Sequence, residues 1–423
     1  MEKLNRRLFL KYAAGLSMGG VCLASTAKKQ DVAPERGTFP SKIWPSTPPP
    51  DCPFPHSQKI SGLRFRGRYA GYAHADTWYP SWASDNRLYS PWTDGAVNGV
   101  RSSSAGSNAT TGQATILGDD PLNLKISDVR TYKGDPSPYG GRYPCGSLVH
   151  GGIWYYGTYC LMDSDGDPSK GLNWDILGPF VGFRCSRDLG KTWQDTPHTP
   201  SNPLLPEPED PGKTVRFGAP HFVDFGRDMQ YSPEGKAYLV AHGSREPDTA
   251  PRRANASWIT GDQIYLARVT PSPANINDAS KYEFFGGHDG NGQPVWVTDF
   301  KQMQPLLDWN NNCGSVTATY IAPLKKYLMC VTDGRNTISR FNTYILEADS
   351  LTGPWKLVSY MRSFGEQAYF VNIPSKFIAA DGKTMWLCYA ANFTNGYLHT
   401  KYSANPPGGG YGMTLQEVEL VAA

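Results

Sequence analysis

Short apolar and aromatic runs, each closed by turn-forming residues, recur through most of this 423-residue chain. They are about five to eight residues long and are bounded by Gly, Pro, Asp or Asn, which is typical of strands rather than amphipathic helices. Aromatic residues make up 13% of the chain, and 44 Gly and 35 Pro can supply many turns, so short strands are favoured. The runs are Ile153–Tyr159, Val181–Cys185, Ala237–Ala241, Ile264–Val269, Tyr327–Thr332, Thr343–Leu346 and Met385–Tyr389.

These runs group into a looser repeat of roughly 65 to 75 residues, and internal repeats of a supersecondary unit indicate solenoids, propellers or arrays. Each unit opens with a turn of small residues or Pro, followed by a strand. Radial repetition of four-stranded sheets leaves few exposed strand edges. We therefore predict an all-β fold, a β-propeller with five blades of four antiparallel strands; a two-sheet sandwich is the alternative. The predicted openings begin at Asp76, Cys145, Ala219, Cys313 and Asn372.

The domain boundaries follow from composition. Residues 28–58 are rich in Pro and Ser, which predicts an extended linker without a core of its own. Residues 59–423 form the predicted propeller domain, whose length suits a single all-β unit. We expect the last blade to close with the strand Thr414–Val421, or with help from the segment Leu63–Gly71.

Residues 1–27 have the organisation of an export signal. Arg6 and Arg7 precede a weakly apolar stretch, Tyr12–Leu23, and small residues run from Ala24 to Ala27. This order is that of a secretory signal, and the paired arginines resemble the twin-arginine type. The apolar stretch is too short to span a bilayer. We expect export to the periplasm or the extracellular space, without a membrane span; a lipid anchor at Cys22 is the alternative.

The net charge of +3 lies entirely in this signal. Cleavage near residue 27 removes four of the 41 basic residues and one of the 38 acidic ones, leaving 37 of each. Nothing in such a balance indicates nucleic acid or an anionic membrane as a partner. Twin-arginine substrates are exported folded, so we assume no disulfide framework. Apolar packing is expected for the cysteines within strand-like runs, which are Cys160, Cys185, Cys330 and Cys388.

Two turns sharpen the fold prediction. Ser186–Trp193 matches the Asp-box, a turn between outer propeller strands. In it, Asp188 should accept backbone hydrogen bonds, Gly190 should be left-handed, and Trp193 should pack between sheets. The turn Gly353-Pro354-Trp355 resembles one found in five-bladed glycoside hydrolases of the arabinanase and invertase type. Neither turn carries chemistry; by resemblance, both indicate a propeller that acts on carbohydrate.

The first predicted opening concentrates the candidate chemistry. Asp76 and Asp94 stand among three tryptophans and two tyrosines. Asp85-Asn86 is a turn by composition, so the two aspartates should lie on paired strands at similar distances from it. Two carboxylates in an aromatic setting suit glycoside hydrolysis, in which one is held protonated as the acid while the other is the base or nucleophile. The tryptophans expected to stack on sugar rings are Trp78 and Trp82.

The run from Asp76 to Gly95 resembles the opening of a propeller family, initially of unknown function, that includes endo-D-arabinanases. In that family two aspartates of the first hairpin are implicated in cleavage, and they correspond to Asp76 and Asp94. The resemblance is good over this run and the Gly-Pro-Trp turn and loose elsewhere. It implies a five-bladed glycoside hydrolase, and arabinanase activity itself is not carried over.

Other openings add candidates. Glu366 precedes the last opening and would be a third acid that tunes the pair. His221 lies on a predicted innermost strand, and an Asn-rich segment before the fourth opening suits recognition of hydroxyl groups. The residues expected to contact the substrate are His221, His242, Arg245, Trp309 and Asn312.

Three readings of the function remain open. The preferred one is a secreted, monomeric glycoside hydrolase that acts on a glycan and needs no cofactor. The second is a polysaccharide lyase that uses His221 and His242, with Tyr265 and Arg268 as partners; the third is a glycan-binding propeller without catalysis. The run from Asp163 to Asp167 resembles the start of a calcium loop but has no Glu at the twelfth position, so we expect a solvated turn, with a structural Ca²⁺ as the alternative.

Overall fold

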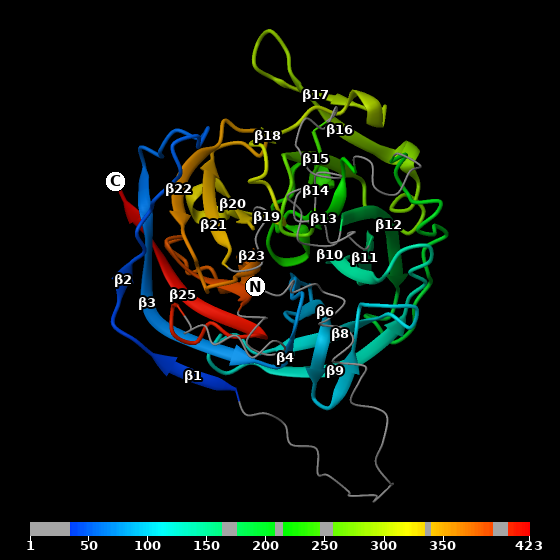
Figure 1. Cartoon of the computed structure of the whole chain (residues 1–423), viewed down its shortest axis with the longest axis horizontal. Helices are drawn as coiled ribbons and strands as arrows, with labels where there is room; N and C mark the ends of the chain where they lie inside the picture. Colours follow the sequence, from blue (N-terminus) through cyan, green and yellow to red (C-terminus); the bar gives the residue numbers. More distant parts are fainter. Residues whose placement is uncertain (1–33, 163–175, 208–214, 246–256, 335–339, 392–404) are drawn as a thin grey trace, which may run out of the picture.

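The computed structural model describes residues 34–162, 176–207, 215–245, 257–334, 340–391 and 405–423. The signal in residues 1–27 and the Asp163–Asp167 run therefore lie outside the described residues. In the described residues, five antiparallel sheets form a ring around a central channel, which confirms the five-bladed β-propeller (Figure 1).

The blades follow the chain order around the ring. Blade 1 contains β4 (His74–Asp76), β5 (Ser81–Trp82), β6 (Leu88–Val97), β7 (Val100–Ser102), β8 (Thr110–Leu117) and β9 (Lys125–Lys133). Blade 2 contains β10 (Arg142–His150), β11 (Ile153–Met162) and β12 (Ile176–Ser186). Blade 3 contains β13 (Gly218–Phe222), β14 (Ala237–Gly243), β15 (Gln263–Val269), β16 (Tyr282–His288), β17 (Pro294–Val297) and β18 (Leu307–Asp308).

The last two blades complete the circle. Blade 4 contains β19 (Val316–Ile321), β20 (Lys326–Asp333), β21 (Asn342–Ala348) and β22 (Lys356–Met361). Blade 5 contains β23 (Tyr369–Asn372), β24 (Thr384–Ala390), β25 (Met413–Ala422), β3 (Ile60–Tyr72), β1 (Glu35–Thr38) and β2 (Lys42–Ile43). Only blade 4 has the expected four strands; blade 2 has three described strands and the others six.

Helical structure in the described residues is limited to short 3₁₀ turns. These are η3 (Arg227–Met229), η4 (Pro233–Gly235), η5 (Ala279–Lys281), η6 (Phe300–Gln302), η7 (Ala322–Leu324) and η8 (Ser375–Phe377). None of the helices that the structure describes is long and apolar enough to cross a membrane.

The innermost strands correspond to the predicted openings. Each of β4, β10, β13, β19 and β23 begins its blade next to the channel, and each predicted opening lies on one of these strands or within a few residues of it. The apolar runs likewise lie in the strands behind them. In β10, eight consecutive residues from Arg142 to Val149 are buried, since an innermost strand has blades on both sides. This explains why these strands do not show the alternation of a half-exposed sheet.

The ring is closed by strands from both ends of the chain. β25 pairs antiparallel with β3 along most of its length, so the predicted closing strand and the predicted helper segment both take part. Glu417 is almost fully buried and accepts from the guanidinium of Arg68, with a 2.7 Å contact from Nε. This pairing joins the first and last segments of the domain.

Residues 34–58 run along the outside of the ring. β1 and β2 pair with β3, Trp44 is buried against Phe65 at a ring distance of 5.2 Å, and Phe54 lies 5.8 Å from Trp309. The second half of the Pro-rich segment is therefore extended and contributes side chains to the core of blades 4 and 5.

The Asp-box turn has the predicted geometry. In the Asp-box, Asp188 accepts from the N–H and hydroxyl of Thr192 at 2.8 and 2.6 Å, and these bonds lower the pKa of Asp188 to about 2. Gly190 is left-handed with φ +91°. Trp193 packs on Trp154 of blade 2 and donates to a blade 1 side chain. The second turn joins β21 to β22 and buries Trp355.

The cysteines in the described residues are unpaired thiols. The four assigned to apolar packing are buried, and burial raises the pKa of each; they are Cys160, Cys185, Cys330 and Cys388.

Candidate functional site

The two aspartates of the first hairpin lie on neighbouring strands. Asp76 ends β4 and is paired in register with Thr93 of β6, the residue that precedes Asp94. The turn at Asp85-Asn86 therefore brings the two carboxylates to the same end of blade 1. We call this end of the channel, at which Asp76 and Asp94 lie, the Asp76 end.

Asp76 is held by hydroxyl donors from three segments of the chain. Its Oδ1 accepts from Thr77 Oγ1 at 2.9 Å. Its Oδ2 accepts from Tyr369 Oη of β23 at 2.8 Å and from Tyr411 Oη, just before β25, at 3.2 Å. Hydrogen bonds that are donated to a carboxylate favour its ionised form. The surroundings of Asp76 therefore suit a base or nucleophile.

Asp94 has a different set of partners. Its Oδ1 accepts from the N–H of Ser104 at 2.7 Å, and its Oδ2 lies 2.5 Å from Ser104 Oγ. The hydroxyl of Ser104 is the donor in the second of these bonds. Asp94 is also left-handed, with φ 47°, which is uncommon for residues other than Gly and is often found at functional sites.

One hydroxyl connects the two aspartates. Tyr411 Oη bonds Asp76 Oδ2 and also donates to the main-chain carbonyl of Asp94. Because a carbonyl can only accept, the single proton of this phenol is shared between the two residues.

Glu366 lies at the same end of the channel. It is three residues before Tyr369, its backbone is left-handed with φ 61°, and its Oε2 is 2.6 Å from Nε of Arg340. Its role as a third acid stays a prediction.

An aromatic layer surrounds the Asp76 end. The ring of Tyr369 lies 5.0 Å from that of Trp258, which in turn lies 5.9 Å from Phe341 and 5.5 Å from Phe370. These apolar rings lower the local dielectric constant, which strengthens the electrostatic interactions of the nearby carboxylates.

The segment after β13 crosses the opposite end of the channel and bonds to other blades. Asp224 accepts from the N–H and hydroxyl of Ser375 in blade 5 at 2.8 and 2.7 Å. Arg227 donates to the carbonyl of Ser84 in blade 1, and Asp228 accepts from the hairpin of blade 2 at 2.9 Å. Blades 1, 2 and 5 are thus tied to this segment of blade 3 at the far end.

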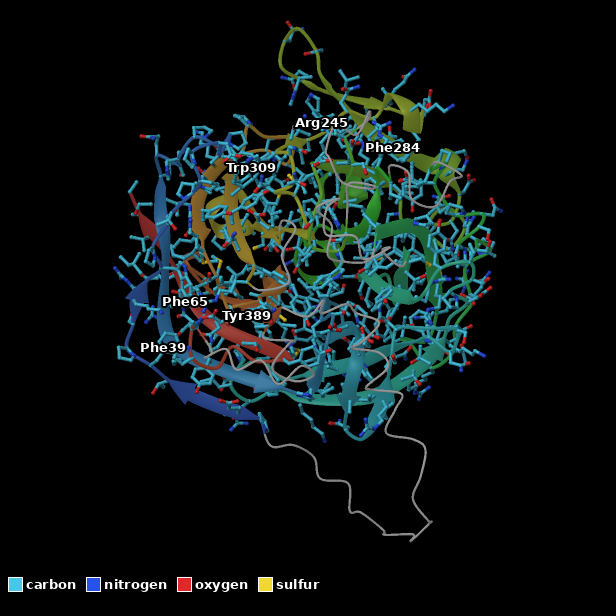
Figure 2. The ribbon with its side chains drawn as sticks, in the orientation of Figure 1. Phe39, Phe65, Arg245, Phe284, Trp309 and Tyr389 are labelled. Atoms are coloured by element: carbon cyan, nitrogen blue, oxygen red, sulfur yellow. The ribbon has the colours of Figure 1, made fainter. Side chains whose placement is uncertain are left out.

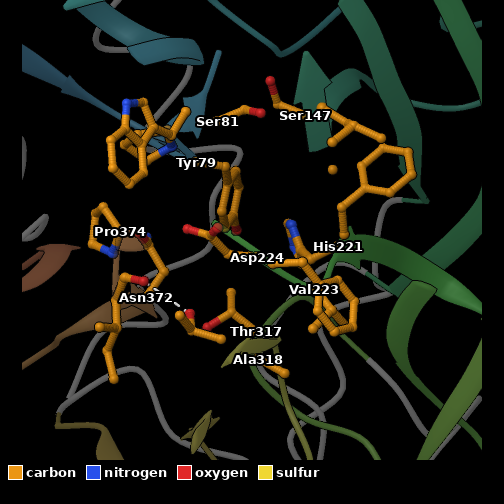
Figure 3. Close-up of a pocket in the computed structure, with 18 of the residues that line it drawn as sticks. Tyr79, Ser81, Ser147, His221, Val223, Asp224, Thr317, Ala318, Asn372 and Pro374 are labelled. Carbon is orange, nitrogen blue, oxygen red and sulfur yellow. Dashed lines mark hydrogen bonds between the residues drawn. The ribbon is translucent and has the colours of Figure 1, made fainter. Parts of the chain in front are cut away.

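A cavity of about 50 Å³ remains inside the channel next to this segment. Figure 3 shows Tyr79 and His221 side by side on its wall, with Asp224 nearby. The rings of Tyr79 and His221 lie 3.9 Å apart. A cavity of this size holds water but not a sugar ring, since one water needs roughly 10–15 Å³ on this measure.

The two tryptophans predicted to stack on sugars lie elsewhere. Trp78 is 1% exposed, belongs to the core between blades, and donates to the carbonyl of Ala75 at 2.8 Å. Trp82 pairs with Leu88 beside the far-end turn and bonds Asn86 at 3.0 Å. Trp78 therefore offers no face to a ligand. Trp82 pairs with the first residue of β6, whereas Asp76 pairs with Thr93 further along that strand.

His221 and His242 are both buried. Burial lowers the pKa of His221 well below its usual value and that of His242 to about 4. His221 lines the inner cavity, while His242 Nε2 donates to the carbonyl of Ser257 at 2.8 Å. Neither side chain contacts Asp76, so both are better described as neutral core groups than as substrate ligands.

The remaining candidates separate into two groups. Arg245 pairs with Asp308 at the rim of blade 3. Trp309 is buried against Tyr344 and donates to Asp51. These contacts hold both side chains away from Asp76 and Asp94, and Figure 2 labels both on the blade 3 and blade 4 side of the ring. Asn312 differs from them. It is buried just ahead of β19, and its Oδ1 has no hydrogen-bond partner in the part of the chain that the structure describes.

Sequence reasoning missed the partners of the two carboxylates. Tyr369 directly precedes the last predicted opening, and Tyr411 is the aromatic residue of a Gly-rich stretch just before the closing strand. The position of each next to a predicted inner or closing strand was a usable signal. Ser104 and Trp258 had none, because each is brought to the site by a connection between strands.

No metal site emerges from the described residues, where no group of three or more His, Cys, Asp or Glu side chains is placed to hold an ion. The calcium-like run at Asp163 lies outside them.

No protein-family model and no curated protein matches this sequence. Among solved structures, a putative hydrolase from Bacteroides ovatus ATCC 8483 is 11% identical with a TM-score of 0.47, over 90% of this chain and 93% of that one. A family 117 glycoside hydrolase produced by Zobellia galactanivorans is 12% identical with a TM-score of 0.42, over 82% and 85%. The α-L-arabinofuranosidase of Podospora anserina is 11% identical with a TM-score of 0.40, over 82% and 91%. These values leave the assignment of function to the site itself.

Proposed function

We propose that this protein is a glycoside hydrolase whose catalytic pair is Asp76 and Asp94. The observation that carries the proposal is the hydroxyl of Tyr411, which bonds the Asp76 carboxylate and the main-chain carbonyl of Asp94. Two carboxylates at one end of a propeller channel, each with a defined hydrogen-bond environment, supply what acid–base cleavage of a glycosidic bond requires.

The partners of each group suggest its role. Asp76 receives three hydroxyl contacts and acts in its ionised form, as base or nucleophile. Asp94, on the neighbouring strand, is the proposed acid that supplies the proton to the leaving oxygen. Glu366, which pairs with Arg340, is the proposed third acid of the site. Asn312 is a candidate for recognition of a sugar hydroxyl.

A lyase mechanism is less well supported by the geometry. Tyr265 donates to the carbonyl of Ser244 at 2.8 Å, and Arg268 pairs with Glu283 at 2.9 Å and stacks on Trp296. These contacts hold Tyr265 and Arg268 in separate structural networks. We therefore favour hydrolysis, in a protein exported by the twin-arginine route and acting on glycans outside the cytoplasm.

The test is turnover of a glycan panel by the mature protein and by Asp76→Asn and Asp94→Asn. Each substitution is isosteric, so we expect the fold to persist and activity to fall about 10²- to 10⁴-fold. Asp85→Asn is the matched control because Asp85 lies in the same hairpin at the far end, and it should retain activity.

Reducing ends and unsaturated uronate absorbance are measured in the same assay. Unsaturated product from the wild type would identify a lyase. Glycan binding without new reducing ends would identify a binding module. Full activity in both Asn variants would remove the catalytic pair from the proposal.

A further inference from the structure

A second cavity, of about 170 Å³, lies between blades 1 and 2, which are neighbours in the ring (Figure 1). Blade 1 contributes β8 and β9, and blade 2 contributes β10, β11 and β12. The wall of this cavity contains four threonines. The two charged side chains of the wall that are buried are Arg142 and Arg184.

Arg184 is buried, and among the described residues it forms no ion pair with a carboxylate. Its guanidinium lies 4.3 Å from the ring of Tyr132 and 4.2 Å from that of Tyr156, and Nη2 donates to Thr111 Oγ1 at 2.6 Å. Its Nε has no hydrogen-bond partner. Aromatic faces stabilise a guanidinium but do not accept its in-plane hydrogens in the way an oxyanion does.

Arg142 supplies a second buried charge. Its Nε donates to Thr158 Oγ1 and its Nη1 to the carbonyl of Asp135, each at 2.7 Å. The side chain is only 6% exposed. Neither this guanidinium nor that of Arg184 forms an ion pair in the described structure, and burying an unpaired charge is costly.

The two carboxylates of the wall lie at its exposed rim, where Asp195 also accepts from the hydroxyl of Tyr132 at 3.5 Å and interacts electrostatically with Arg184. Asp195 accepts from the N–H of Thr196 at 2.9 Å, and Asp135 accepts from the N–H of Ser137 at 3.0 Å. Both side chains are on exposed residues, as is Lys133, which adds a positive charge at the opening. The interior of the cavity is therefore cationic, and hydroxyl groups complete its wall.

From these observations we propose that the cavity between blades 1 and 2 is an oxyanion-binding site, in which Arg142 and Arg184 bind a sulfate, phosphate or carboxylate group. Guanidinium groups and hydroxyls are the donors that proteins use for such anions. The site is formed by residues other than the catalytic pair and is separate from the proposed hydrolysis. The anion would come either from a free ion or from an acidic sugar of a glycan.

The experiment is a titration of the mature protein with sodium sulfate, glucuronate or glucose, at constant ionic strength maintained with sodium chloride. Binding is followed by the melting temperature and by calorimetry. We expect a saturable rise in melting temperature with sulfate or glucuronate and none with glucose, because a ligand that binds only the native state stabilises it. Stronger binding of glucuronate than of sulfate would identify an acidic sugar of a glycan as the source of the anion. A response to sulfate alone would identify a free ion.

Two variants locate the site. Arg184→Met should weaken binding at least about tenfold, as expected for loss of a charge-assisted hydrogen bond. Arg101→Met removes an exposed arginine of blade 1 and should leave binding unchanged. If Arg184→Met fails to fold, Lys133→Glu, at the exposed rim, should still weaken binding several-fold. Absence of saturable binding in the wild type would overturn the proposal. Binding as tight as that of the wild type in both Lys133→Glu and folded Arg184→Met would also overturn it.

Discussion

At the scale of single residues, the proposed chemistry depends on tyrosines that come from distant parts of the chain. Tyr411 packs its ring edge-on against His74 at 5.2 Å and directs its hydroxyl to both aspartates. Tyr369 adds a second phenol to Asp76. Since these donors stabilise the negative charge on Asp76, the pH range in which the enzyme works should depend on them.

Replacement of Tyr411 by Phe tests this dependence. The ring contact with His74 is kept while the shared hydroxyl is lost, so we expect the acid limb of the kcat/KM profile to move to higher pH by about one unit, with about a tenfold lower maximum. Tyr231→Phe, at an exposed position, is the control. An unchanged acid limb in Tyr411→Phe would show that this hydroxyl has only a packing role.

At the scale of elements, the Asp-box ties blade 2 to blade 1. Its Gly190 is left-handed, and the carbonyl of Gly190 and the indole of Trp193 both bond the side chain of Gln113 in β8. A side chain added at Gly190 would place its Cβ 2.6 Å from Gln113 Nε2 and 3.0 Å from the ring of Trp154. The turn therefore needs glycine for its backbone angle and for the space.

Two Gly→Ala substitutions separate these requirements. Gly151, in the hairpin between β10 and β11, has φ +57° with nothing within 4 Å of an added Cβ. Gly151→Ala should therefore cost roughly 1 kcal/mol, from backbone strain alone. Gly190→Ala should cost roughly 2–4 kcal/mol, because a clash adds to the strain. Urea unfolding measures both values; equal losses would mean that the contact with Gln113 and Trp154 relaxes freely.

At the scale of the whole molecule, the interior contains two buried histidines, His221 and His242. The Nε2–H of His242 is bonded to the carbonyl of Ser257, and burial lowers the pKa of His242 to about 4 from an ordinary 6.5. Unfolding exposes this group, so between those values the unfolded chain binds more protons than the native one. The contribution of neutral His242 to the free energy of unfolding is therefore fully present above about pH 6.5 and is lost as the pH falls toward 4.

The loss from His242 should reach roughly 3 kcal/mol at pH 4. His242→Gln keeps an N–H donor without a titratable ring, and we expect it to make the free energy of unfolding clearly less dependent on pH between 6.5 and 4. His221 would account for the part that remains. His288→Gln, on an exposed residue, should leave the dependence unchanged, and the same slope in wild type and His242→Gln would refute this account.

The sequence by itself determined the local structure of the propeller. Turn residues around apolar runs specified the strands, and the repeat of their openings specified five blades. The Asp85-Asn86 turn set the pairing that brings Asp76 and Asp94 together. Each of these features depends on residues within one blade, which is why pattern and turn chemistry were enough to predict them.

Only the tertiary structure decided which side chains reach these aspartates and which do not. Trp78 is directed into the core between blades, whereas Tyr411 reaches Asp76 because β25 closes the ring on β3. Arg142 and Arg184 face one cavity because two sheets are packed side by side. Such contacts join residues that are far apart in the chain, and their geometry is set by how the blades pack, for which a single sequence contains no local signal.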